Sequence, residues 1–139
     1  MRVVLDTNVL VSGLLSPFGT PARVLDLLTS GLLIPLFDDR ILQEYTEVLA
    51  RPRFGFAADD VSTLLTYLRM HGELVVAPPL DVDLPDPDDL PFLEVAAAAG
   101  ARAVVTGNAR HFLPRRGAHD AEVWSPAELL SHFRAFPTD

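Results

Sequence analysis

The sequence predicts a three-layer α/β/α domain with a mostly parallel central sheet, and two observations support this fold class. Short apolar runs rich in β-branched residues alternate along the chain with longer segments of helical periodicity, which is the pattern of strand–helix–strand units. Hydrophobic residues make up 49% of the 139 positions, enough to bury one core, and no linker or internal repeat divides the chain. We therefore expect residues 1–139 to form a single domain.

Five short runs predict the strands of this sheet, at residues 3–5, 32–37, 74–76, 103–106 and 122–124. Helical patterns between and after them predict helices at residues 20–30, 41–50, about 59–70, 92–99 and 126–133. Local signals mark several of their ends. Thr20 fits an N-cap, Asp38 and Asp39 fit the start of the second helix, and Gly31 and Gly100 fit helix stops.

Composition excludes several classes of protein. The formal net charge is −8, so a broad basic surface for nucleic acid is absent, and any nucleic-acid binding must be local and assisted by divalent cations. The lack of cysteine excludes disulfides, zinc ribbons, iron–sulfur clusters and thiol nucleophiles. No apolar run reaches the roughly 18–20 residues of a membrane-spanning helix, and the short apolar start is unlike a signal peptide. We expect a cytoplasmic protein without membrane contact.

Two carboxylates are placed by their elements near one edge of the predicted sheet. Asp6 directly follows the first strand, and ligands bind at the C-terminal ends of parallel strands. It could equally cap the next helix or form an Asx turn. Glu44 lies on the border of its helix's apolar stripe and could reach into a polar cleft, although an isolated glutamate is more often solvated.

A third group of carboxylates lies in the acidic loop over residues 78–89. Asp86, Pro87 and Asp89 fit an ordinary helix start, but five aspartates between residues 81 and 89 exceed what one cap needs, and such density of like charge calls for a counter-ion. Asp89 precedes the core-facing pair Phe92 and Leu93 by three and four residues, so it should face the sheet. We expect Asp86 and Asp89 to point inward, and solvated side chains at Asp81, Asp83 and Asp88.

The turn Thr106-Gly107-Asn108 brings neutral oxygens to the same edge, unless it is simply a strand exit. Four separate segments then converge there, and Mg²⁺ or Mn²⁺ prefers such oxygen ligands. The bound ion would activate water and stabilise charge on a phosphoryl group, so no nucleophilic side chain is needed. The expected metal ligands are Asp6, Glu44, Asp86, Asp89 and Asn108.

Four blocks, in order, resemble the PIN-domain family over nearly the whole chain. They are V-V-L-D-T-N-V-L-V-S-G-L, D-D-R-I-L-Q-E-Y-T-E-V-L-A-R-P, D-P-D-D-L-P-F-L-E-V-A-A-A-A-G-A and V-V-T-G-N-A-R-H-F. The branch they resemble most is the bacterial group of toxin components of type II toxin–antitoxin systems.

This resemblance implies a Mg²⁺- or Mn²⁺-dependent endoribonuclease that hydrolyses RNA phosphodiester bonds. It implies catalytic carboxylates at Asp6, Glu44 and Asp89, an additional acid at Asp86, and supporting roles for Asn8 and Thr106. It also implies a homodimer that a small antitoxin protein inhibits.

The chain departs from the family pattern at two positions. Many relatives have an acid where this chain has Asn108, and an asparagine where it has Leu90. Because an amide carries no charge, we expect one firmly held metal ion, with any second one arriving with the RNA phosphate.

RNA contacts are expected at Arg110, His111 and Arg51, with Arg53 as a further candidate, because guanidinium groups bind phosphate bidentately. For all four, an ordinary solvated role is the alternative.

Other enzyme classes fit poorly. The chain has no lysine, which haloacid-dehalogenase-like phosphatases and response-regulator receivers require, and no G-x-G-x-x-G follows the first strand as in a dinucleotide-binding fold. The alternative to a nuclease is a catalytically weak PIN-fold module that binds RNA or protein.

Overall fold

The computed structural model describes residues 1–135 and shows the predicted α/β architecture. In this part of the chain, five parallel strands form one sheet in the order β3-β2-β1-β4-β5. Their bounds are β1 Arg2–Leu5, β2 Ile34–Phe37, β3 Glu73–Leu74, β4 Ala103–Val105 and β5 Val123–Trp124. The three central strands are almost fully buried, as expected for a parallel sheet covered on both faces.

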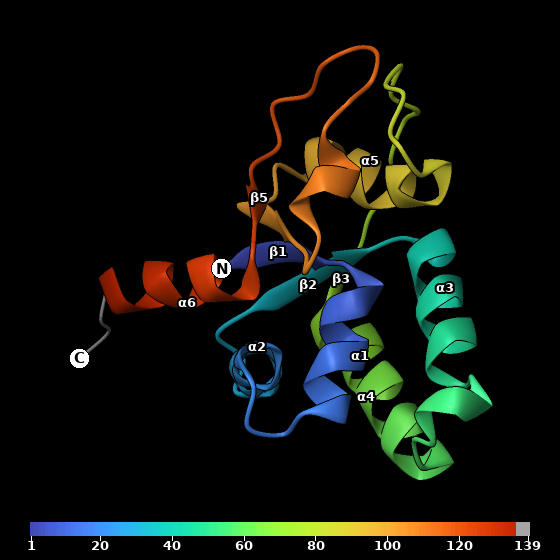
Figure 1. The fold of residues 1–139 in the computed structure, drawn as a ribbon, viewed down its shortest axis with the longest axis vertical. Helices are drawn as coiled ribbons and strands as arrows, with labels where there is room; N and C mark the ends of the chain where they lie inside the picture. Colours follow the sequence, from blue (N-terminus) through green and yellow to red (C-terminus); the bar gives the residue numbers. More distant parts are fainter. Residues whose placement is uncertain (136–139) are drawn as a thin grey trace.

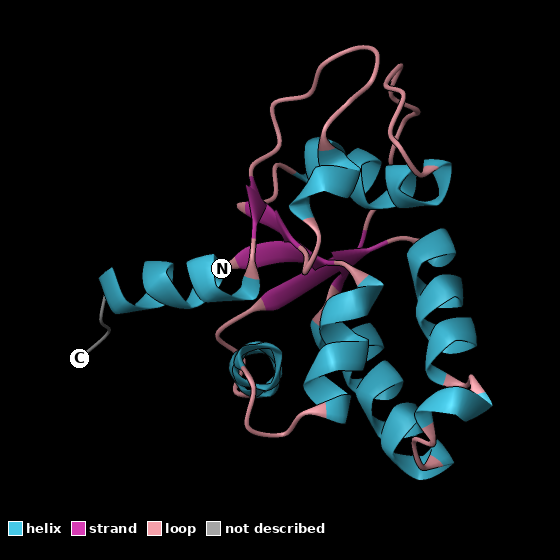
Figure 2. Ribbon diagram, in the orientation of Figure 1, coloured by secondary structure: helices cyan, strands magenta, loops and turns pink. Residues whose placement is uncertain are grey.

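Helices cover both faces of the sheet (Figures 1 and 2). Their bounds are α1 Thr7–Leu15, α2 Thr20–Thr29, α3 Asp39–Leu49, α4 Ala58–His71, α5 Leu90–Ala99 and α6 Pro126–Ala135. In Figure 1, α5 lies on one side of the sheet and α1, α2 and α4 lie on the other. The helix α3 packs against α4, α5 and β2, and α6 packs beside β5 and α2.

Most predicted elements are present, with ends shifted by one or two residues. The helix α2 is capped by Gly19 rather than Thr20, and α4 is capped by Ala57, so Asp59 and Asp60 instead lie in its first turn near the positive end of the helix dipole. Asp38 caps α3 as expected, since its side chain accepts a hydrogen bond from the Ile41 amide. Gly100, with φ 62°, ends α5.

The helix α1 is the element that the sequence analysis did not predict. Its apolar side chains fall all round the helix, so no single stripe reveals it. Gly13 lies where α1 packs most closely against α2, and a Cβ there would come within 2.6 Å of Leu25 Cδ1. The missed helix matters because it begins directly after Asp6.

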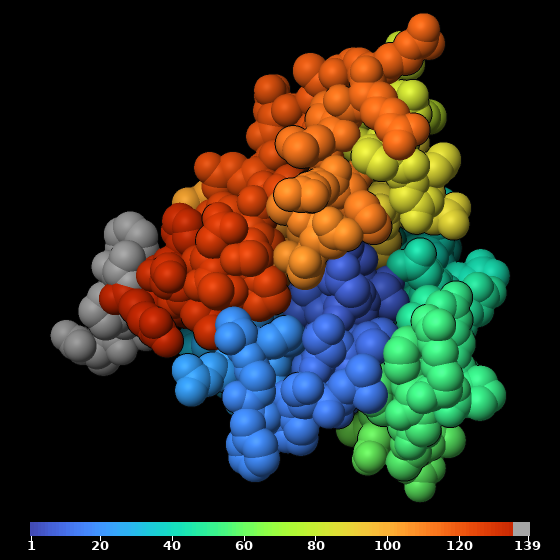
Figure 3. Space-filling view, viewed as in Figure 1, coloured from blue at the N-terminus to red at the C-terminus, as the bar shows by residue number. Residues whose placement is uncertain are grey.

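The topology brings distant segments to one edge of the sheet. The central strands β1 and β4 end side by side, and the chain leaves them at Asp6 and Thr106. Figure 3 shows one face on which the blue N-terminal segments, the green segments around α3 and the yellow and orange C-terminal half meet. No helix within residues 1–135 is long and apolar enough to cross a membrane.

Candidate active site

Asp6 lies at the end of β1, directly before α1. It occupies the N-cap position of α1, yet within the described chain its side chain makes no capping hydrogen bond. The Thr106 hydroxyl donates instead to Asp6 Oδ2 at 2.7 Å, and Asp6 is only 5% exposed. The alternative that Asp6 serves merely as a helix cap therefore does not explain its conformation.

Thr106 and Asn8 connect the ends of the two central strands. Besides donating to Asp6, the Thr106 hydroxyl accepts hydrogen bonds from the Asn108 amide at 3.0 Å and from Asn8 Nδ2 at 3.4 Å. Asn8 Oδ1 accepts a hydrogen bond from the Gly107 amide at 3.0 Å. This network fixes the position of the Asp6 carboxylate relative to the loop after β4, as the expected supporting roles of Asn8 and Thr106 require.

Glu44 reaches the same place from α3. It is half-buried, and the Thr7 hydroxyl donates a hydrogen bond to Glu44 Oε2. The next residue, Tyr45, is fully buried and donates its hydroxyl to the carbonyl of Leu5, the residue before Asp6. These two bonds, which the sequence analysis did not foresee, tie α3 to the end of β1.

Asp86 and Asp89 belong to the short 3-10 turn Pro87–Asp89 (η2) before α5. Asp86 is exposed and caps this turn by accepting a hydrogen bond from the Asp88 amide at 2.9 Å. Asp89 is buried, and within residues 1–135 its Oδ2 atom has no hydrogen-bond donor. His111 Nδ1 lies 3.3 Å from this oxygen, close enough for an ion pair but without hydrogen-bond geometry.

The carboxylates raise the pKa of one another. Burial raises the pKa of Asp89 to about 7, with further contributions from the negative charges of Asp6 and Asp86. Burial also raises the pKa of Asp6, against the lowering effect of the Thr106 hydrogen bond. The pKa of Glu44 is raised by burial and, after the opposing Thr7 hydrogen bond, by Asp6. A cation bound beside these carboxylates would favour their charged forms.

These side chains line one open hollow of about 390 Å³. It contains seven of the predicted site residues, namely Asp6, Asn8, Glu44, Asp86, Asp89, Arg51 and His111, and also Arg53. Thr106 is buried beside it, in contact with Asp6. The other two predicted residues, like Thr106, do not line the hollow. Asn108 directs its amide to His111 Nε2 at 3.0 Å, and Arg110 is exposed on the 3-10 turn Ala109–Phe112 (η3).

Sequence reasoning missed some residues of the wall. Val48 and Phe54 line the hollow, as does Asp88, which is exposed as predicted. Glu44 and Val48 are spaced by four residues, so they share one face of α3, whereas Arg51 follows the end of that helix. That spacing was a usable signal, whereas Phe54 carries none in the sequence alone.

The donor set fits a hard divalent cation in its chemistry. Within residues 1–135, no three acidic or histidine side chains are spaced closely enough to enclose an ion as they stand. Mg²⁺, however, is commonly held by one or two carboxylates, with water and phosphate completing its shell. A cation would give the buried Asp89 Oδ2, which has no hydrogen-bond donor, a partner. It would also neutralise the repulsion from the charges of Asp6, Glu44 and Asp86.

Comparison with known proteins agrees with this geometry. An uncharacterized protein of the archaeon Methanocaldococcus jannaschii is 25% identical over 147 residues, which cover 98% of this chain and 94% of the relative. It does not support the expected bacterial toxin branch, since it is archaeal and has no recorded role. The model of the PIN domain matches residues 2–110, a span that runs from β1 to the start of η3 and includes every carboxylate of the hollow. The chain therefore belongs to the PIN domain family.

Proposed function

We propose that this protein is a metal-dependent endoribonuclease. PIN domains are generally nucleases that use divalent metal ions. The observation that carries the proposal for this chain is the convergence of Asp6, Glu44 and Asp89, from three separate elements, on one hollow that leaves a buried carboxylate oxygen without a donor.

In this proposal, Asp6, Glu44 and Asp89 hold Mg²⁺ or Mn²⁺, with Asp86 beside them. The ion would activate water and stabilise charge on the scissile phosphate of RNA. The protein's own contribution is to fix the carboxylates: Thr106 and Asn8 hold Asp6, Thr7 holds Glu44, and the η2 turn holds Asp89. Asn108, whose Nδ2 contacts His111, would act as a neutral ligand through Oδ1.

The direct test is cleavage of structured and single-stranded RNA by the purified protein with Mg²⁺, with Mn²⁺ and with a chelator. We expect metal-dependent internal cleavage that Asp6→Asn, Glu44→Gln and Asp89→Asn each reduce by at least about 100-fold. Glu47→Gln is the matched control, because Glu47 lies on the exposed face of the same helix. Intact RNA under all conditions, with wild type and Asp6→Asn behaving identically, would support the alternative of a binding module.

The biological role is a separate part of the proposal. We propose that the enzyme acts in the cytoplasm as the toxin of a toxin–antitoxin pair, as a homodimer that a small antitoxin protein inhibits. Two findings would support it. The first is a short reading frame beside the gene. The second is growth arrest on expression, which should disappear with Asp6→Asn or when the neighbouring frame is co-expressed. Normal growth despite demonstrated RNA cleavage in vitro would remove the toxin role and leave the nuclease.

A further inference from the structure

The hollow continues past the carboxylates to a wall of a different character. Glu44 and Val48 of α3 line it, then Arg51 just beyond the end of α3, and Arg53 and Phe54 of the 3-10 turn Pro52–Phe54 (η1) complete this end. Arg51 follows the C-cap of α3, seven residues after Glu44, so the carboxylate and this wall come from successive segments of the chain. One open hollow therefore has an acidic end and, within the reach of a neighbouring nucleotide, a basic and aromatic end.

The two arginines at this end are free of carboxylate partners within residues 1–135. Arg2, Arg40 and Arg102 each form ion pairs in the described structure, whereas the side chains of Arg51 and Arg53 form none and are exposed. In a chain of net charge −8, unpaired cations beside an acidic hollow are available to a ligand that carries negative charge.

Arg53 forms the top of a stack of three flat groups. Its Cζ atom lies 4.8 Å from the centroid of the Phe54 ring, and the Phe54 and Phe56 rings stack with centroids 5.5 Å apart at an angle of 16°. Gly55, between the two residues in the sequence, has φ 65° and allows the tight turn that brings both rings to one side of the chain. The exposed Arg53 guanidinium thus lies over an aromatic ring at the end of the hollow.

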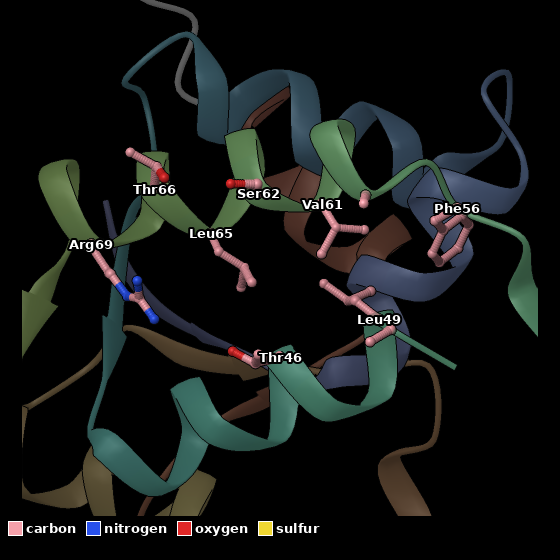
Figure 4. Close-up of a pocket in the computed structure, with 10 residues that line it drawn as sticks. Thr46, Leu49, Phe56, Val61, Ser62, Leu65, Thr66 and Arg69 are labelled. Carbon is pink, nitrogen blue, oxygen red and sulfur yellow. The ribbon is translucent and has the colours of Figure 1, made fainter. Parts of the chain in front are cut away.

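The lower end of the stack is anchored in the body of the protein. Phe56 lines a second hollow, between α3 and α4, where Leu49, Val61 and Leu65 are its apolar neighbours (Figure 4). This second hollow opens on the opposite side of α3 from Glu44, so a ligand of the carboxylate site does not enter it. Phe54 thus lines the first hollow while its stacking partner is fixed beside the second.

We propose that Arg53, stacked on Phe54 and Phe56, forms a base-binding subsite for one unpaired nucleotide next to the scissile phosphate. Arg51 binds the phosphate that links this nucleotide to the site of cleavage. This inference rests on the proposed ribonuclease function and assigns which residues select the substrate. Nucleobases stack on guanidinium planes as well as on aromatic rings, and the larger purines offer more stacking area. The subsite therefore prefers a purine at that position and excludes a base held in a duplex.

The test is an abasic scan of a short fluorescent RNA, measured by anisotropy in Ca²⁺ buffer and by single-turnover cleavage in Mn²⁺. One abasic position should weaken binding to the wild type about 5- to 20-fold. Arg53→Lys keeps the charge and loses the planar group, and Phe54→Leu keeps apolar bulk without the ring. Each should weaken binding of the intact RNA by a similar factor. Both variants should be insensitive to that abasic position, because the base no longer has its platform.

Three controls separate the possible explanations. Arg51→Ala should weaken intact and abasic RNA equally, since it loses a phosphate contact. Arg69→Ala on α4 removes the same charge at the second hollow and should change binding less than twofold. Circular dichroism spectra and melting temperatures equal to those of the wild type verify that Arg53→Lys and Phe54→Leu are folded.

The outcomes also separate this subsite from the nuclease. If the wild type cleaves RNA but Arg53→Lys and Phe54→Leu respond to the abasic scan as the wild type does, the subsite is wrong and the nuclease stands. If no RNA is cleaved but the scan shows the expected dependence on Arg53, the subsite stands on a binding module. If the wild type binds every abasic RNA equally, the subsite is overturned whatever the cleavage assay shows.

Discussion

Asp89 is the residue whose charge is most affected by folding. Its pKa is raised from 3.8 to about 7, first by burial and then by Asp6 and Asp86. Between these two pH values the folded protein binds a proton that the unfolded chain does not. Stability therefore falls as pH rises from about 4 to about 7 and is level above that range.

The corresponding prediction concerns Asp89→Asn without metal ions. The variant should be more stable than the wild type, and its advantage should grow between pH 4 and pH 7 to about 1–2 kcal/mol, after allowance for solvent screening. Thermal unfolding in chelator at several pH values measures this. Asp86→Asn, an exposed change of the same charge, is the control, and added Mg²⁺ should reduce the advantage because it stabilises the wild-type carboxylate. An advantage that shrinks with rising pH would contradict the assignment.

Thr106 allows a second prediction for a single residue. Its hydroxyl forms three hydrogen bonds. Thr106→Val therefore removes one hydrogen bond from each of Asp6, Asn8 and the Asn108 amide. We expect a loss of about 1–2 kcal/mol in the free energy of unfolding and a fall in metal affinity or activity of about 10- to 100-fold. Thr106→Ser should restore most of both. Equal activity in the valine and serine variants would show that the hydroxyl does not position Asp6.

The contrast between residues that were and were not predictable has a physical basis. Asp6 and Asp89 were found because strand ends and helix periodicity are local signals. The hydrogen bonds of Thr7 with Glu44 and of Tyr45 with Leu5 join residues 37 and 40 positions apart, and nothing local encodes them. Asn108 was expected in the site from its place after a strand, but its rotamer is set by His111, three residues away.

Among the elements, α3 and α5 are joined by a half-buried ionic contact. Arg40 in the first turn of α3 contacts both Asp38 and Glu94, and the Glu94 side chain on α5 is only 4% exposed. Its other oxygen, Oε2, accepts a hydrogen bond from the Leu80 amide at 2.7 Å, at the start of the acidic loop. This contact holds together the elements that carry Glu44 and Asp89.

Two matched substitutions test this contact. Glu94→Gln replaces a carboxylate oxygen with an NH2 group that faces hydrogen-bond donors, and it removes the negative charge that compensates Arg40. It should therefore lower the free energy of unfolding by about 1–3 kcal/mol. Glu122→Gln makes the same chemical change in the exposed pair with Arg102, where the glutamate side chain is 56% exposed, and should cost less than about 1 kcal/mol. Urea midpoints compare the two. Equal midpoints would mean that the α3–α5 contact contributes no more than a surface pair.

The sequence predicted elements best where one face is apolar. The stripe of α3 and the Gly100 stop of α5 located these helices to within two residues. By contrast, the apolar side chains of α1 fall all round the helix although only part of it is buried, so periodicity could not reveal it. The strand β3 is only two residues long and begins one residue before the predicted run, because its register is set by pairing with β2.

At the scale of the whole molecule, a net charge of −8 limits how RNA can be held. With few free cations near the carboxylates, binding at fixed Mg²⁺ should depend weakly on salt. About two phosphate contacts predict a slope of log K against log salt concentration of about −1.4 for single-stranded RNA. Titrations between 50 and 300 mM KCl measure it, at protein concentrations below Kd. A slope steeper than about −4 would indicate a broad basic surface that the fold does not provide.

The Gly55 turn also has a consequence for redesign of the enzyme. A side chain at position 55 would meet no atom within 4 Å, so the glycine is there only for its backbone conformation. Residues 51–56 therefore form a short surface segment, here called the cassette, that follows α3 and is fixed to the protein by the Phe56 ring. Exchanging this cassette for another sequence should alter which RNA the enzyme selects while the carboxylates, which lie on other elements or earlier on α3, keep their positions. In the proposed ribonuclease, substrate choice and chemistry would thus be separable.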